Sequence, residues 1–87
     1  MPNGDKYIGQ IKHDKFNGYG IMYYKNGDMY EGCWKDDKKE GDGNIHYKNG
    51  DEYKGKWFED KKQGEGTLLH KKREVYKGNW HAGHRDG

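Results

Sequence analysis

Residues 26–48 read NGDMYEGCWKDDKKEGDGNIHYK, and this stretch decides the fold because most of the chain repeats it. Its tyrosine recurs every 23 residues without an insertion, at Tyr7, Tyr30, Tyr53 and Tyr76. Gly32 and Trp34 follow the same interval, except that Ile11 stands where the first tryptophan would be. A fixed period of this size predicts a stack of identical units, each covering its neighbour. Such arrays present extended surfaces more often than enclosed active sites.

Each unit is predicted to be a two-stranded hairpin. Asn26-Gly27 lies between two runs of strand-forming residues, and Asn-Gly supplies the two positive-φ positions of a type I′ turn. The connection from Lys35 to Glu40 is expected to be longer, polar and closed by Gly41. The chain is therefore predicted to be all-β, a single-layer antiparallel β-meander of about seven strands, built as a repeat ribbon of hairpins.

Alternation along each strand gives the ribbon two different faces. Tyr30, Gly32 and Trp34 point one way, whereas Glu31 and Cys33 point the other. One face is thus predicted to be aromatic and aliphatic and the other charged, as suits a sheet with a single solvated face. Glycines between the rings let them lie flat on the backbone and let the sheet bend. With no helix predicted to cover the rings, we expect a curved ribbon with an aromatic concave face.

Composition limits the class of protein. The 87 residues allow one small domain, and only 29% of them are hydrophobic while 37% are charged. Eight tyrosines, three tryptophans and two phenylalanines at fixed places argue against disorder. The single cysteine excludes an intramolecular disulfide, which favours a cytoplasmic location. The net charge of +2 is too balanced to indicate a nucleic-acid partner, and no stretch is long enough to span a membrane.

The stretches YEGCWKDDKKEGDGNIHYKNGD and YKGKWFEDKKQGEGTLLHKK resemble MORN repeats, whose pattern is roughly Y-x-G-x-W, a polar loop, G-x-G-x-hydrophobic-x-aromatic and a turn rich in Asn, Asp and Gly. The resemblance covers nearly all of the domain at 1–87, as full repeats at 3–25, 26–48 and 49–72 and a half repeat at 73–87. It implies a single-layer meander with no catalysis by the repeats themselves. We expect a fragment of a longer array, whose parent protein could carry a kinase or methyltransferase domain.

Three departures from the repeat pattern carry expectations of their own. Ile11 in place of tryptophan predicts that the first repeat's end of the concave face is shallower and less aromatic. His70 replaces a tyrosine in the third repeat. Lys72-Arg73 replaces Asn-Gly between the third and fourth units, so the connection there is expected to differ in geometry.

The aromatic face is the leading candidate for a binding site. Its rings are either the core of a one-layer sheet or a groove for a partner segment, and ring faces can be buried while ring edges stay exposed. A terminal strand edge offers a second route, to another strand or to another copy of the domain. We therefore expect a protein-interaction or scaffolding module. The candidate partner-binding residues are Tyr7, Tyr24, Tyr30, Trp34, Tyr47, Tyr53, Trp57, Tyr76 and Trp80.

A lysine-rich edge supports an alternative function. Two lysine pairs recur at 23 residues and would line one edge of the sheet, at Lys38, Lys39, Lys61 and Lys62. Such a row suits anionic phospholipid headgroups, which would make the domain a peripheral membrane module. Carboxylates among these lysines would cancel much of their field. The two alternatives predict a cytoplasmic protein associated with a membrane or with the cytoskeleton.

Neither catalysis nor metal binding is predicted. The chain contains no serine, and Cys33 is expected on the polar face without a histidine partner. His81 and His84 have a spacing found in metal sites, but no cysteine pair or carboxylate cluster completes a tetrahedral site. The sequence therefore predicts no enzyme activity, no metal and no cofactor.

Overall fold

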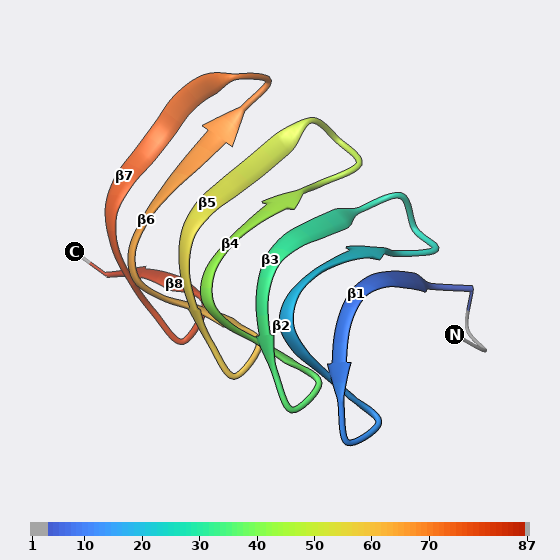
Figure 1. Ribbon diagram of the computed structural model, residues 1–87. Helices are drawn as coiled ribbons and strands as arrows, with labels where there is room; N and C mark the ends of the chain where they lie inside the picture. Colours follow the sequence, from blue (N-terminus) through green and yellow to red (C-terminus); the bar gives the residue numbers. More distant parts are fainter. Residues whose placement is uncertain (1–3, 87) are drawn as a thin grey trace.

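The computed structural model describes residues 4–86, and every regular element in this range is a β-strand (Figure 1). The strands are β1 (Lys6–Lys12), β2 (Lys15–Tyr23), β3 (Met29–Lys35), β4 (Lys38–His46), β5 (Asp51–Phe58), β6 (Lys61–His70), β7 (Arg73–His81) and β8 (His84–Asp86). They join in chain order into one antiparallel sheet. The predicted meander is confirmed, with the three-residue β8 as an addition.

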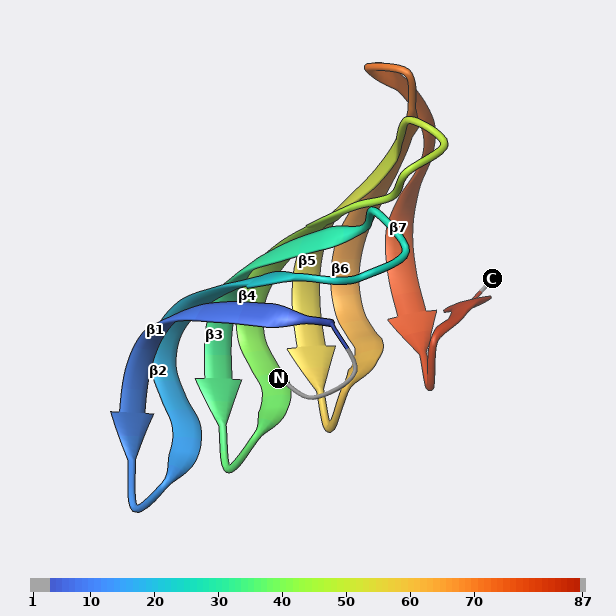
Figure 2. The same ribbon diagram turned by 90° about the vertical axis from the view of Figure 1, so that its right-hand side faces the viewer.

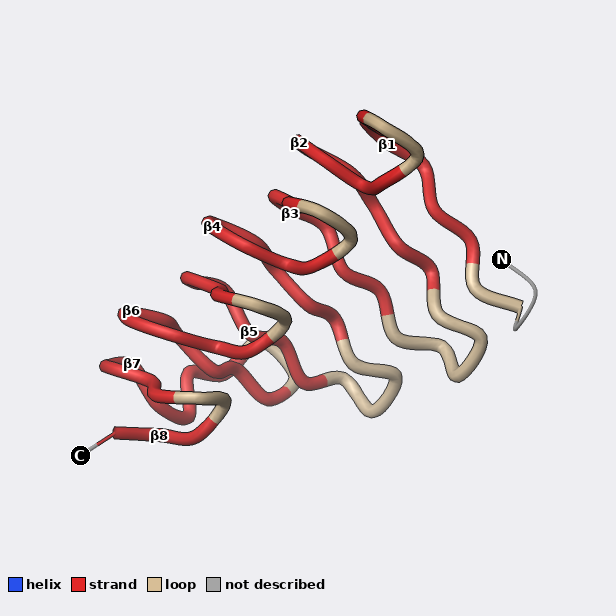
Figure 3. Tube along the Cα trace, turned by 90° about the horizontal axis from the view of Figure 1, so that it is seen from below, coloured by secondary structure: helices blue, strands red, loops and turns tan. Residues whose placement is uncertain are grey.

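The sheet is a single open layer that bends along the length of its strands (Figure 2). Seen from below, successive hairpins lie side by side, and their connections form a row along each long edge of the ribbon (Figure 3). The chain measures 38 × 23 × 17 Å along its principal axes. The inside of the bend is the concave face, where the large aromatic side chains gather.

A row of directly paired glycines crosses seven strands. Its members are Gly9, Gly20, Gly32, Gly43, Gly55, Gly66 and Gly78. A Cβ on Gly43 would lie less than 3 Å from the ring of Tyr30, and one on Gly32 less than 3 Å from the Gly43 backbone. Both rings and neighbouring strands thus approach more closely here than a larger residue would allow, as expected for glycine inside strands.

The core is a ladder of rings on the concave face. The buried hydrophobic side chains are Met22, Tyr30, Trp34, Ile45, Tyr53, Trp57 and Trp80. Tyr30 is fully buried in a one-layer sheet because Trp34 and Trp57 meet it edge-on from both sides, with ring centroids 5.1 and 5.4 Å away. Such pairs add about 0.5–1.5 kcal/mol each to the burial of their surface. Tyr53 repeats this arrangement, so the 23-residue period becomes a continuous ladder.

The two-residue connections lie where the sequence predicted longer loops. Asp36-Asp37 alone joins β3 to β4, and both residues have positive φ, 49° and 70°, as a type I′ turn requires. The expected longer connection from Lys35 to Glu40 is therefore wrong, because Lys35 and Lys38 already pair across the turn. Between β6 and β7 a similar two-residue turn replaces the Asn-Gly connection, which confirms the expected change of geometry there.

The Asn-Gly connections are the longer ones. Residues 24–28 join β2 to β3, and among them only Gly27 has positive φ. The Gly27 amide donates to the Tyr24 carbonyl over 3.0 Å, and the Asp28 amide donates to the Asn26 side chain over 2.9 Å. This is a type I turn followed by a glycine in the left-handed region, so the predicted type I′ turn is wrong.

Aspartates tie the second and third hairpins to the hairpin before each. The Asp37 amide donates to the Phe16 carbonyl over 3.1 Å, and the Phe16 amide donates to Asp37 Oδ1 over 2.8 Å. Asp60 and Lys39 exchange the same two bonds one repeat later. We call this arrangement the aspartate clasp. Asp14, Asp37 and Asp60 recur at 23 residues, so the signal is present in the sequence, although their turns resemble ordinary polar loops.

The outer face is charged over most of the ribbon. His46 lies 3.3 Å from a carboxylate oxygen of Glu31 and 3.3 Å from one of Glu52. Glu52 is buried and also accepts a bond of 2.9 Å from the Lys72 ammonium, which lowers the pKa of that carboxyl. This network joins β3, β4 and β5 to the turn before β7.

The first repeat departs from the predicted charged outer face. Ile8 pairs with Ile21 on neighbouring strands, and Ile8, Tyr19 and Tyr23 are all exposed. Later repeats carry charged side chains at several of these positions, such as Asp42 in place of Tyr19. Exposed apolar side chains also occur in later repeats, at Phe58 and Val75, so the prediction of a charged outer face holds only in part.

Candidate functional site

The predicted binding residues separate into buried and accessible rings. Tyr30, Trp34, Tyr53, Trp57 and Trp80 are buried and form the ladder. The remaining predicted rings are half-buried and pack at its margins, at Tyr7, Tyr24, Tyr47 and Tyr76. The structure thus places all nine on one face, with the second group forming the part that a partner can reach.

The polar atoms of the ladder are bonded within the sheet. The Tyr30 hydroxyl donates to the Cys33 carbonyl over 2.9 Å, at the point where the register between β3 and β4 shifts. Trp34 Nε1 donates to the Gly20 carbonyl over 3.2 Å, and Trp57 repeats that bond to Gly43. Burial raises the pKa of Tyr30 above its usual range. These hydroxyl and indole groups are structural, so a ligand would meet mainly ring carbon.

The predicted lysine edge divides between the two faces. Lys39 and Lys62 lie on the concave face, where each ammonium is 5.3–6.0 Å from the centroids of four rings. Lys38 and Lys61 are exposed. All four lie at the starts of β4 and β6, along one edge of the ribbon as predicted, but neighbouring residues of a strand point to opposite faces, so the four ammonium groups do not form one row. Binding of phospholipid stays a prediction.

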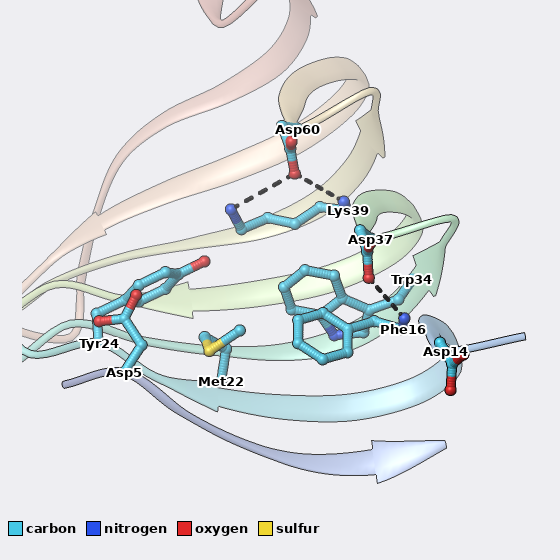
Figure 4. Close-up of a pocket in the computed structure, with 9 residues that line it drawn as sticks. All are labelled: Asp5, Asp14, Phe16, Met22, Tyr24, Trp34, Asp37, Lys39 and Asp60. Carbon is cyan, nitrogen blue, oxygen red and sulfur yellow. Dashed lines mark hydrogen bonds and ion pairs between the residues drawn. The ribbon is translucent and has the colours of Figure 1, made fainter. Parts of the chain in front are cut away.

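A hollow of about 570 Å³ lies on the concave face over the first two repeats and reaches Asp60 of the third (Figure 4). We call it the aromatic groove. Its floor is formed by Phe16 and Met22 of β2, Tyr24 of the connection between β2 and β3, and Trp34 of β3. Its rim carries Lys39 and four carboxylates, from Asp5, Asp14, Asp37 and Asp60.

Phe16 is the groove residue that the sequence analysis missed. It occupies the repeat position of Lys39 and Lys62, so a phenylalanine stands where the later repeats have a lysine. Its ring stacks on Tyr7, with centroids 3.8 Å apart, and meets Trp34 edge-on at 5.4 Å. The expectation of a less aromatic end at Ile11 is therefore wrong, since Phe16 supplies the missing ring.

The aspartate clasps fix two of the rim carboxylates, those of Asp37 and Asp60. Asp37 Oδ1 is fixed by the Phe16 amide, and Asp60 Oδ1 accepts from the Lys39 amide and lies 3.8 Å from its ammonium. Figure 4 shows both carboxylates above the floor, with Asp14 and Asp5 toward opposite ends of it. The groove therefore combines an apolar floor with fixed negative charge.

The other side chains considered for metal binding or catalysis are not gathered into a site within the described residues. Within residues 4–86, no group of three or more histidine, cysteine, aspartate and glutamate side chains is placed to hold a metal ion. His81 Nδ1 lies 3.4 Å from the Gln63 amide, and Cys33 is a half-buried free thiol. In the same range no helix is long and apolar enough to cross a membrane.

The comparisons with known proteins agree with this geometry. The chain matches the MORN repeat over residues 7–29, 30–52, 53–72 and 76–87, which together make up most of its length. Each matched segment begins at a tyrosine of the 23-residue period, at Tyr7, Tyr30, Tyr53 and Tyr76. MORN repeats are generally non-catalytic modules, and no enzyme family matches. No curated protein matches the chain significantly. The matched segments cover three full repeats and one partial repeat, and the chain therefore belongs to the MORN-repeat family.

Proposed function

We propose that this MORN module binds a segment of a protein partner in the aromatic groove. The observation that carries the proposal is the apolar floor of Phe16, Met22, Tyr24 and Trp34, which is open on the concave side. Aromatic side chains are enriched at the energetic centres of protein interfaces. The module would then act as a scaffold that recognises a partner without chemical change.

The groove suits side chains of a peptide rather than a whole folded surface. Its volume of about 570 Å³ lies within the range of small-ligand sites. The hydroxyl and indole groups of the ladder are already bonded, so affinity would come from apolar contact with Tyr24 and Phe16. A partner segment would therefore insert one or two large apolar side chains.

Selection from a random peptide library on the immobilised protein tests the proposal. Selected peptides should bind wild type and lose about tenfold or more in affinity when Tyr24→Ala removes one large contact of the floor. Tyr47→Ala is the matched control, because Tyr47 holds the same position one repeat later and lies outside the groove. Circular dichroism confirms that both variants fold. Peptides that tolerate Tyr24→Ala as well as Tyr47→Ala would overturn the proposal.

The same preparation separates the two alternatives. Light scattering over a range of concentrations detects self-association through a strand edge, which Tyr24→Ala should leave unchanged. Sedimentation with vesicles of anionic phospholipid detects membrane binding, for which the exposed Lys38 and Lys61 are the remaining candidates. Vesicle binding that Lys38→Glu and Lys61→Glu abolish, without any groove-dependent peptide, would favour the membrane module instead.

A further inference from the structure

We propose that the segment bound in the aromatic groove is cationic, an extended peptide in which a large apolar residue lies between two arginine or lysine residues. This inference rests on the proposed function and adds the chemistry of the partner. The observation behind this proposal is that an apolar floor and four carboxylates line the same hollow (Figure 4).

The charge of the groove is opposite to that of the chain. Four aspartates and one lysine line it, which gives 1 − 4 = −3, whereas the whole chain carries +2. The one ammonium, on Lys39, already lies 3.8 Å from Asp60 and faces four rings. It therefore offsets Asp60, and Asp14 and Asp37 at the Phe16 end suffice to keep the groove negative. A cation entering the groove meets net negative charge beside low-dielectric ring surfaces, which focus the field.

The carboxylates are fixed in place, which favours an ionic partner. Asp37 and Asp5 each have one oxygen held by a backbone amide, from Phe16 and Lys25 respectively, over 2.8 Å. Side chains that are already ordered lose little conformational entropy when a cation binds. Asp14 is exposed at the Phe16 end, in a turn with defined positive φ. Three of the four rim carboxylates, those of Asp5, Asp37 and Asp60, are thus held in place by a backbone amide.

The distribution of charge also sets the order of groups in the ligand. In Figure 4, Asp5 stands near Tyr24 at one end of the floor, and Asp14 and Asp37 stand near Phe16 at the other. The apolar floor lies between these two acidic ends. A segment lying along the groove would place an apolar side chain on the floor and one cation at each end. Arginine suits both tasks, because its guanidinium binds carboxylates in a bidentate manner and stacks on rings.

Capped peptides of defined charge test this inference on the whole chain. The first has leucine between two arginines, the second has citrulline in place of each arginine, and the third has glutamate there. Isothermal titration at low salt should show the arginine peptide binding about tenfold more tightly than the citrulline peptide. The advantage should shrink as salt screens the charges. Equal affinity of the arginine and citrulline peptides, or tighter binding of the glutamate peptide, would overturn the cationic preference.

Variants of the rim locate the charges that act. Asp14→Asn and Asp37→Asn together should weaken the arginine peptide about fivefold and leave the citrulline peptide unchanged. Asparagine accepts positive φ and keeps an oxygen for the Phe16 amide, so the fold should survive. Asp36→Asn is the matched control, because Asp36 belongs to the same turn as Asp37 but does not line the groove. Equal effects of Asp36→Asn and of the double variant would contradict the assignment.

The outcomes distinguish this inference from the function on which it rests. Should Tyr24→Ala leave the affinity of every bound peptide unchanged, the groove itself is not the binding site and both proposals fail. Should citrulline or glutamate peptides bind at least as well as the arginine peptide, in a manner that Tyr24→Ala abolishes, the groove function stands and only the cationic preference fails.

Discussion

Replacing Gly43 with alanine should destabilise the protein much more than one added methyl group suggests. The new Cβ would lie less than 3 Å from the hydroxyl oxygen and two ring carbons of Tyr30. That ring is fully buried between Trp34 and Trp57, so it cannot move without displacing both. Overpacking of this kind costs about 1–3 kcal/mol. A displaced ring would also lose the hydroxyl bond to the Cys33 carbonyl, worth about 1 kcal/mol.

A smaller opposing term comes from the unfolded chain. Alanine restricts the unfolded state relative to glycine, which stabilises the fold by about 0.4–1 kcal/mol. The net expectation for Gly43→Ala is a loss of about 2–3 kcal/mol. A domain of 87 residues has about 4–13 kcal/mol in total, so the midpoint of unfolding in urea should fall clearly. Tryptophan fluorescence and far-ultraviolet circular dichroism both report that midpoint.

Gly78→Ala is the matched control at the end of the glycine row. There the nearest atom, the Tyr76 hydroxyl, would be 2.9 Å from the new Cβ, and Tyr76 is only half-buried. Its ring has room to move, so the expected loss is below about 1 kcal/mol. Adding Tyr30→Phe to Gly43→Ala removes the closest clashing atom, and the double variant should lose less than the sum of the two changes. Equal losses at Gly43 and Gly78 would refute the close-approach argument.

Three further predictions concern the clasp and the titratable groups. Asp37→Ala should cost about 1–2 kcal/mol of unfolding free energy, because it leaves a backbone amide without its acceptor, whereas Asp36→Ala should cost less; urea titration of both variants checks this. Burial raises the pKa of Tyr30 well above the usual 10.0 and that of Tyr53 to about 12. The contribution of both hydroxyls to stability is therefore complete below pH 10.0 and is lost as the pH rises further. Urea midpoints measured from pH 9 to 12 should fall over that window, and a flat profile would contradict this reasoning. The lowered pKa of Glu52 means that its contribution is present above the usual value of 4.5 and is lost as the pH falls below it, so Glu52→Gln should flatten the acid limb of the same titration.

Much of the fold could be predicted because the decisive patterns are local and repeated. The alternation of Tyr30, Gly32 and Trp34 places them on one face whatever the rest of the chain does. The glycines between rings predict close approach, and the structure confirms it at Gly43. The family resemblance rests on the same positions and is confirmed by the match over most of the chain.

The turns could not be predicted in the same way. Asn-Gly favours a type I′ turn when the hairpin stands alone. Here Asn26 belongs to a type I turn, and only Gly27 after it has positive φ. Asp36-Asp37 adopts the type I′ conformation, and His13-Asp14 and Lys71-Lys72 have the same pair of positive φ values, so the tight geometry belongs to the two-residue loop itself. Asp37 adds a bond to Phe16, which is 21 residues away. The residue preferences of Asn-Gly and Asp-Asp therefore did not indicate which connections are tight. The error moved Lys39 into a loop and hid its place on the concave face.

The candidate site shows the same division. The sequence identified the rings, but it could not separate buried Tyr30 from accessible Tyr24, because burial depends on which neighbours stand on both sides. Phe16 was missed because it does not recur: the later repeats have a lysine at its position. The acidic rim joins residues from the first three repeats and could not be assembled without the bend of the sheet.

The 23-residue period by itself determined the meander, the two faces and the row of glycines, because each follows from residue spacing along a strand. Tertiary structure decided the rest. It determined which connections are tight, and it joined the turns at Asp37 and Asp60 to the hairpin before each. It also gathered an apolar floor and four carboxylates from the first three repeats into a single groove, since only the bend and the stacking of hairpins bring those side chains together.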